Sequence, residues 1–141
     1  MKIAGFFICD AVDKPRGLDS PYIVLNPGSF RVRIDATTKA VSFGVFVLLT
    51  FEGGDEFRPN LVLKFVRDGM PFLSIPMPAQ PADETSLRRH CGHVKLKNVS
   101  SFSPGPYSVE LWSAAGNEPL ASAHFEAVSQ SPDAPPSSLG P

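Results

Sequence analysis

The chain has 141 residues, of which 43% are hydrophobic and 19% charged, and this composition is typical of one globular domain. Its formal net charge is -1, so it lacks the basic excess that nucleic-acid-binding domains use to neutralise phosphates. No apolar run comes near the roughly 20 residues that a membrane-spanning helix requires. The composition therefore argues against nucleic acid and membrane as partners.

The start of the chain superficially resembles that of a secreted lipoprotein. Its apolar part is short, however, and bulky Ile8 precedes Cys9 where processing requires a small residue. We interpret Ile3–Cys9 as a buried first strand and expect a cytoplasmic protein. The two cysteines, Cys9 and Cys91, are then expected to be reduced thiols. A Cys9–Cys91 disulfide is the alternative if the protein is exported by another route.

The 15 prolines and 11 glycines divide the chain into segments of the length that strands usually have. In 41–51 every odd position is apolar and the opposite face is partly apolar, which predicts a central strand covered on both sides at one end. The alternation in Phe30–Asp35 predicts a half-buried strand with Phe30, Val32 and Ile34 toward the core.

Two hairpins are predicted. The first joins Leu61–Val66 to Met70–Ile75 through Asp68-Gly69, a pair that tolerates the positive φ angles of a type I′ turn. Because its prolines lack the N–H donor of a strand ladder, the return strand is expected to be short and at a sheet edge. The second hairpin joins Tyr107–Trp112 to Pro119–Val128.

Less regular sequence lies between the hairpins. An extended loop is expected from Pro76 to His90, and Leu87–Cys91 is expected to be a short helical turn or irregular. His93–Lys97 alternates again and predicts a strand.

About seven or eight strands without interposed helices predict an all-β fold, an antiparallel β-sandwich over residues 1–128. An α+β fold with a helix near Leu87 is the alternative. Residues 129–141 are polar and rich in proline and serine, which predicts a disordered tail.

The segment Ser103–Val109 resembles the corner of immunoglobulin-like domains. There a Gly-x-Tyr step, here Gly105 and Tyr107, enters the penultimate strand, and the tyrosine hydroxyl bonds to nearby backbone. Val109 stands where antibody domains have their second cysteine. The resemblance therefore implies a disulfide-free immunoglobulin-like sandwich in which Tyr107 is a buried corner residue.

A narrower resemblance involves the two ends of the domain. Cys9-Asp10 at the end of the first strand, together with Phe102–Tyr107 and the last hairpin, is similar to a group of small uncharacterised bacterial and phage β-sandwich proteins. That family has no assigned activity, so the resemblance implies no catalytic residue and no ligand.

The chemically richest stretch contains His90, Cys91 and His93 beside two arginines. Two imidazoles and a thiol could bind a soft divalent metal, and the neighbouring positive charge would favour a nucleophilic thiolate. A metal site would need further ligands such as Cys9 or His124, and a catalytic cysteine would need a base and an oxyanion site that the sequence does not place. We therefore predict no catalytic residue, cofactor or metal, and keep this stretch as an alternative.

A compact sandwich without a clustered acid, base or nucleophile generally carries its function on loops and sheet edges. We therefore predict a non-enzymatic protein-binding or accessory module, whose unknown protein partner could be a second copy added at a sheet edge. The candidate surfaces are the loop 76–90 and the edge at Met70–Ile75. Binding of a small ligand or glycan between the sheets is a further alternative.

Overall fold

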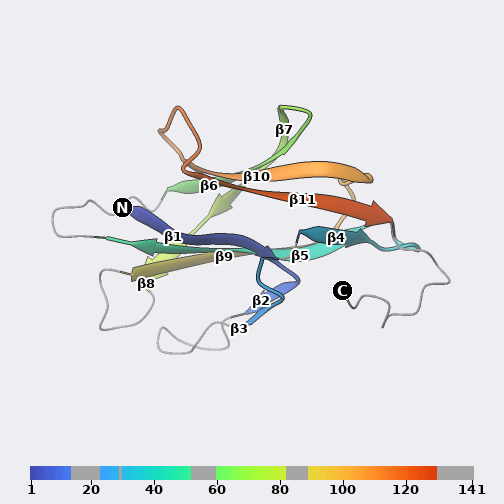
Figure 1. The fold of residues 1–141 in the computed structure, drawn as a ribbon, viewed down its shortest axis with the longest axis horizontal. Coiled ribbons are helices and arrows are strands. Elements are labelled where there is room, and N and C mark those ends of the chain that lie inside the picture. The colour runs from blue at the N-terminus through green and yellow to red at the C-terminus, as the bar shows by residue number, and fades with distance from the viewer. Residues whose placement is uncertain (14–22, 29, 52–59, 82–88, 130–141) are drawn as a thin grey trace.

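The computed structural model describes residues 1–13, 23–28, 30–51, 60–81 and 89–129. These residues form strands and no helix (Figure 1). The strands are β1 (Lys2–Cys9), β2 (Ala11–Asp13), β3 (Ile23–Leu25), β4 (Arg31–Ile34), β5 (Val41–Thr50), β6 (Leu61–Arg67), β7 (Met70–Met77), β8 (Ala79–Pro81), β9 (Arg89–Val99), β10 (Gly105–Ser113) and β11 (Ala121–Ser129).

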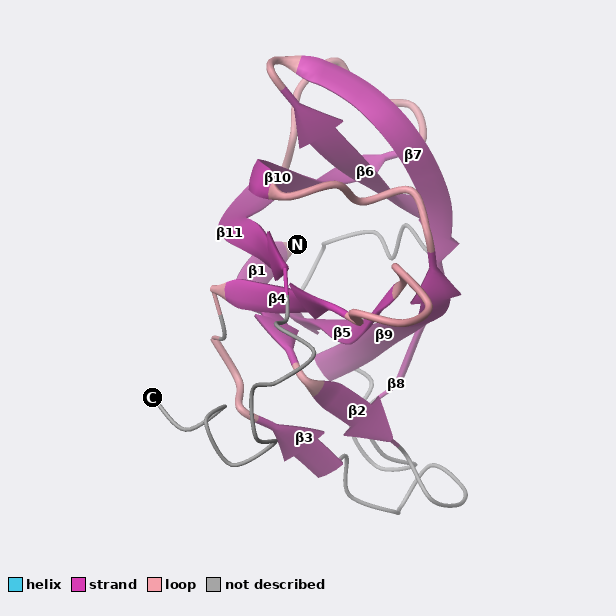
Figure 2. Ribbon diagram, turned by 90° about the vertical axis from the view of Figure 1, so that its right-hand side faces the viewer, coloured by secondary structure: helices cyan, strands magenta, loops and turns pink. Residues whose placement is uncertain are grey.

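Two sheets face each other, which confirms the predicted all-β class and is compatible with the predicted sandwich (Figures 1 and 2). One has the strand order β1-β5-β9-β8 and the other has the order β4-β11-β10-β6-β7. The ribbon β2-β3 forms a separate two-stranded sheet beside the four-stranded one. The prediction of a purely antiparallel fold is wrong at one place, because β4 runs parallel to β11.

The main core lies between the sheets and is dominated by phenylalanines. Phe43 of β5 is its centre: the ring lies 6.0 Å from that of Phe65, 5.8 Å from that of Phe102 and 5.5 Å from that of Phe125. The odd positions of β5 face this core, as the alternation predicts. The contacts with Phe65 and Phe102 are edge-to-face, and such contacts stabilise the core beyond the burial of the rings.

A smaller apolar cluster lies on the outer face of the four-stranded sheet. It consists of Cys9, Val12, Phe46 and Cys91, with Phe7, Val24 and Leu48 packed against it. Val12 and Val24 come from the β2-β3 ribbon, which therefore covers part of β5. This confirms the prediction that the central strand is covered on both sides at one end.

Each of the eight predicted segments contains a strand, but three details differ. β9 begins at Arg89, so the expected turn or irregular segment is wrong for residues 89–91, whereas 87–88 lie outside the described residues. Phe30 is 65% exposed instead of buried, because it precedes β4 and only its carbonyl joins the sheet, accepting from the Glu126 amide. β7 has 8 residues and is not short, although it does lie at an edge.

Three strands carried no sequence signal strong enough to predict them. β2, β3 and β8 have 3 residues each, too few to show a period. β8 interrupts the loop expected from Pro76 to His90, of which 82–88 lie outside the described residues.

The last strand ends at Ser129, one residue beyond the predicted domain boundary, and the predicted tail from 130 onward lies outside the described residues. In the part of the chain that the structure describes, no helix is long and apolar enough to span a bilayer. The cytoplasmic location stays a prediction.

Candidate functional site

The sequence suggested a metal site or a catalytic cysteine at His90, Cys91 and His93 as an alternative. The alternation of β9 places His90 and Cys91 on opposite faces of the sheet. His90 is opposite Leu49 and is buried between the sheets, with its ring 4.8 Å from that of Phe51. Cys91, the next residue, belongs to the cluster on the outer face. Adjacent residues of a strand point to opposite faces, so closeness in sequence did not become closeness in space.

The other candidate ligands do not complete a site around Cys91. His93 is opposite Phe46 and half-buried, whereas His124 is exposed on β11 of the other sheet. Among the described residues, no three His, Cys, Asp or Glu side chains are grouped as metal ligands. Of the three residues, His90 therefore faces the core, whereas Cys91 and His93 share the outer face of the four-stranded sheet without a third ligand grouped beside them among the described residues.

Cys9 and Cys91 lie on either side of β5, where they are opposite Gly44 and Leu48. Four residues along a strand and two strand spacings separate their Cα atoms by roughly 16 Å. A disulfide requires less than about 7 Å, so the alternative of a Cys9–Cys91 bridge is wrong for this fold.

Cys9 is completely buried, and its environment disfavours the thiolate. Burial raises the pKa of the Cys9 thiol to about 11, with a smaller contribution from the negative charge of Asp10. A protonated, inaccessible thiol is a poor nucleophile and a poor metal ligand. Cys9 therefore acts as a small apolar residue beneath the β2-β3 ribbon.

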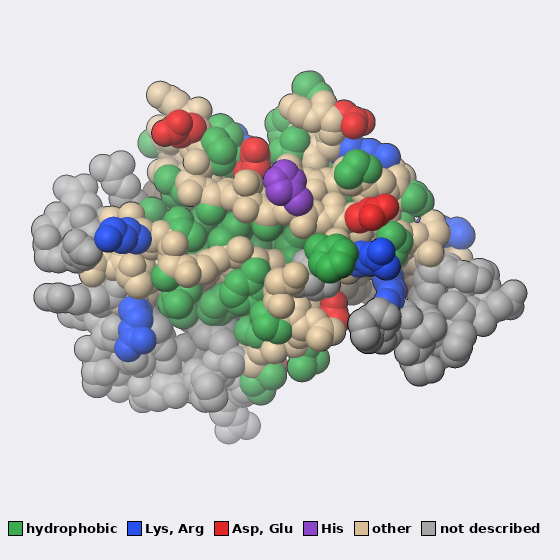
Figure 3. Space-filling model, in the orientation of Figure 1, with side chains coloured by type: hydrophobic (Ala, Val, Ile, Leu, Met, Phe, Trp, Pro, Cys, Tyr) green, Lys and Arg blue, Asp and Glu red, His purple; other side chains and the backbone are tan. Residues whose placement is uncertain are grey.

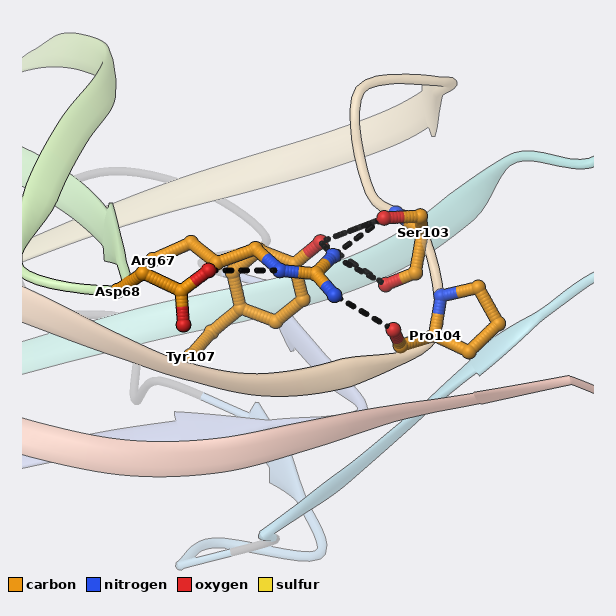
Figure 4. Close-up of polar contacts among 5 residues, drawn as sticks. All are labelled: Arg67, Asp68, Ser103, Pro104 and Tyr107. Atoms are coloured by element: carbon orange, nitrogen blue, oxygen red, sulfur yellow. Dashed lines mark hydrogen bonds and ion pairs between the residues drawn. The ribbon is translucent and has the colours of Figure 1, made fainter.

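The corner predicted at Gly105-x-Tyr107 is present (Figure 4). The Tyr107 hydroxyl donates to the Ser103 carbonyl oxygen at 2.8 Å and accepts from the Ser103 amide at 3.0 Å. These two hydrogen bonds therefore tie the start of β10 to Ser103, in the segment that precedes it. Tyr107 is buried, as the resemblance to immunoglobulin-like corners implied.

Arg67, at the end of β6, is the part of this corner that sequence reasoning missed. Its guanidinium donates to the Tyr107 hydroxyl at 2.7 Å and to the Pro104 carbonyl oxygen at 2.9 Å, and it also bonds to Ser103 (Figure 4). The guanidinium carbon lies 5.0 Å from the centroid of the Tyr107 ring. Arg67 and Tyr107 lie 40 positions apart in the chain, so no local pattern could have paired them.

The corner supports an exposed apolar surface at the start of β7, which we call the β7 tip and define as Met70, Pro71 and Phe72. Met70 is 69% exposed and Phe72 40% exposed. The Phe72 ring packs 5.4 Å from that of Phe102 and 5.6 Å from that of Tyr107. Hydrophobic atoms are visible at the end of the projecting β6–β7 hairpin (Figures 1 and 3). The β7 tip is thus an apolar, projecting surface whose Phe72 ring is fixed by its contacts with Phe102 and Tyr107.

The outer face of the five-stranded sheet carries a polar and aromatic group. The Lys64 ammonium lies 4.0 Å from the centroid of the Trp112 ring, and the Trp112 indole N–H donates to Glu110 at 3.1 Å. Alternation places these side chains on one face, but only the β6–β10 register makes Lys64 and Glu110 neighbours. Since Lys64 and Glu110 bind the ring and its N–H, Trp112 is engaged within the chain.

The chain matches no protein-family model, no curated protein and no solved structure. The resemblance to small bacterial and phage sandwich proteins stays a prediction.

Proposed function

We propose that the chain is a non-enzymatic protein-binding module built on an immunoglobulin-like sandwich. In the lettering of immunoglobulin domains, one sheet has the order ABED and the other contains the strands G, F and C. The orders β1-β5-β9-β8 and β11-β10-β6 agree with this arrangement, and the Tyr107 corner at the start of β10 corresponds to the corner of strand F. These features support the immunoglobulin-like assignment.

The observation that carries the binding proposal is the exposed β7 tip with its rigid support. Binding energy at protein interfaces is concentrated in a few large side chains that are already held in position. Phe72 has this character, because Phe102 and Tyr107 hold one side of its ring while the remainder is exposed. A partner with an apolar pocket or an apolar strand would cover the tip.

The experiment introduces a lysine at each of two exposed apolar sites and compares how much partner each variant recovers. Tagged wild-type protein, Met70→Lys and Leu120→Lys are expressed at matched levels in the native cell, cross-linked and purified, and the bound proteins are quantified by mass spectrometry. Leu120 is also exposed and lies next to β11, so its variant controls for added charge. We expect at least a tenfold loss of the main partner for Met70→Lys alone. Equal recovery with all three proteins would show that the β7 tip is not the binding surface.

A further inference from the structure

We propose that the partner at β7 is a second copy of this chain, whose own β7 pairs antiparallel with it across a twofold axis. This inference rests on the proposed function, since it uses the surface of which the β7 tip is one end. The two five-stranded sheets would then join into one continuous sheet of ten strands.

β7 is the last strand of its sheet. It is hydrogen-bonded to β6 on one side, and no strand among the described residues pairs with its other side. In Figure 2 it curves along the margin of the upper sheet, away from β11. Such an edge presents backbone donors and acceptors to which another strand can bind.

The two prolines of β7 define which part of this edge can pair. Pro71 and Pro76 are opposite Val66 and Val62 of β6. A proline within a strand is tolerated where its nitrogen faces away from the neighbouring strand. The register shift between Pro71 and Leu73 changes the alternation by one residue, so both nitrogens, although five positions apart, face the open side. The open edge therefore lacks a donor at both ends. By alternation from Pro76, the N–H and carbonyl of Ser74 face the open side, near the middle of the strand.

A twofold axis at Ser74 gives a register that suits the side chains. Ser74 would exchange two backbone hydrogen bonds with its own counterpart. Leu73 would then be opposite Ile75 of the second copy, and Ile75 opposite Leu73. Both residues are only partly buried against the core, so each would gain an apolar neighbour on the inner side of the sheet.

The charge of the strand favours a second copy over an unrelated partner. Edge strands that remain single are commonly protected by charged residues, especially lysine. β7, with the sequence MPFLSIPM, carries no charged residue over its 8 positions. Across a twofold axis each residue lies near its own counterpart, so any charge would meet a like charge. An uncharged strand meets itself without this repulsion.

The contact is small, so we expect a weak dimer that forms at about 100 μM and dissociates at about 1 μM. The test is sedimentation velocity across this range on the full-length chain, on Ser74→Lys, on Ser74→Glu and on an equimolar mixture of both variants. Each variant alone places like charges at the axis and should be monomeric. The mixture should restore a dimer, because the opposite charges then meet. Ser122→Lys, which changes an exposed serine of β11 in the same sheet, should dimerise like the wild type.

Circular dichroism and thermal unfolding verify that the Ser74 variants are folded, and the charge-swapped mixture tests the register even if each variant is somewhat destabilised. A wild-type chain that is monomeric up to about 1 mM would overturn the inference, as would a dimer that persists in Ser74→Lys. A monomeric chain that still loses its cellular partner in Met70→Lys would retain the proposed function and reject only the second copy as partner.

Discussion

Tyr107 illustrates how one hydroxyl can hold a loop, a strand and a neighbouring hairpin together. It bonds to both backbone groups of Ser103 and accepts from Arg67, whose guanidinium also bonds to the Pro104 carbonyl. Gly105 lies in the middle of this arrangement with φ +140, and a Cβ there would lie 2.7 Å from Arg67 Nη2. The backbone angle therefore requires glycine, and an added Cβ would also displace the Arg67 guanidinium from its position.

We predict that Tyr107→Phe destabilises the fold by about 1–3 kcal/mol, because it leaves part-buried partners of the hydroxyl without their hydrogen bond. The ring contacts with Phe102 and Phe125 are retained in this variant. Urea unfolding monitored by circular dichroism measures the change, with Ser108→Ala, the next and outward-facing residue of β10, as the control. A loss no greater than that of the control would contradict a structural role for the hydroxyl.

The raised pKa of Cys9 predicts a specific loss of stability in alkali. The thiol ionises at about 9.0 in the unfolded chain but only at about 11 in the folded one, so rising pH favours the unfolded state within this window. The difference in unfolding free energy between wild type and Cys9→Ala should therefore shrink by about 1 kcal/mol between pH 8 and pH 10. Urea unfolding of both proteins at the two pH values gives the comparison. A difference in unfolding free energy that is the same at both pH values would contradict the raised pKa of Cys9.

At the scale of elements, the β2-β3 ribbon is fastened to the outer face of β5. An ion pair of 2.9 Å joins Asp13 of β2 to Lys95 of β9, and the backbone amide of Asp10 donates to the Leu25 carbonyl. Both ion-pair side chains are well exposed, so the pair contributes little. The closer fit is at Gly44, where an added Cβ would lie 2.8 Å from Val12 Cγ1 and 3.0 Å from Cys9 Sγ.

We predict that Gly44→Ala destabilises the fold by about 1–3 kcal/mol through this overlap, since the affected atoms are buried and cannot move freely. Gly5→Ala on the neighbouring strand β1 is the matched control, because its Cβ would make only contacts of 3.8 Å. Its effect should stay near 0.5 kcal/mol or less. Thermal unfolding of the two variants makes the comparison. Equal unfolding midpoints would show that the β2-β3 ribbon can move to accommodate the added Cβ without loss of stability.

The β6–β7 turn has the geometry that Asp68-Gly69 predicts. Their φ angles are +53 and +75, both in the left-handed region of a type I′ turn. We predict that Gly69→Ala costs about 1 kcal/mol from backbone strain alone, because nothing lies within 4 Å of the added Cβ. Asp68→Asn, which keeps a residue tolerant of this conformation, should be neutral in the same urea titration. An unchanged free energy of unfolding in Gly69→Ala would mean that the turn adopts another backbone conformation without strain.

For the whole molecule, the strand order decides the chemistry of the two cysteines. β5 lies between β1 and β9, so it separates Cys9 from Cys91 although both belong to one apolar cluster. We predict that the native protein forms no internal disulfide during incubation with oxidised glutathione. Alkylation after denaturation, followed by mass spectrometry under non-reducing conditions, should therefore count two thiols in the monomer. A monomer that is lighter by two hydrogens and takes up no label would contradict the strand order.

The sequence was sufficient for features that depend on neighbours along the chain. Alternation, apolar runs and turn residues located the eight longer strands, Asp68-Gly69 indicated its turn, and Gly105-x-Tyr107 indicated a corner hydrogen bond only four residues long. It failed for β2, β3 and β8, because three residues are too short to display a period. It also mistook the start of β9, where buried residues on both faces hide the alternation.

By itself, then, the sequence determined the all-β fold class, the position of the main strands and the core face of β5, because these follow from side-chain period and turn chemistry. Only the tertiary structure decided what each strand lies beside. It brought Arg67 to Tyr107, separated His90 from Cys91 across a sheet, and left the uncharged β7 at the margin, where no strand among the described residues pairs with its second side. Strand order and register arise from long-range packing of whole faces, which no local spacing encodes.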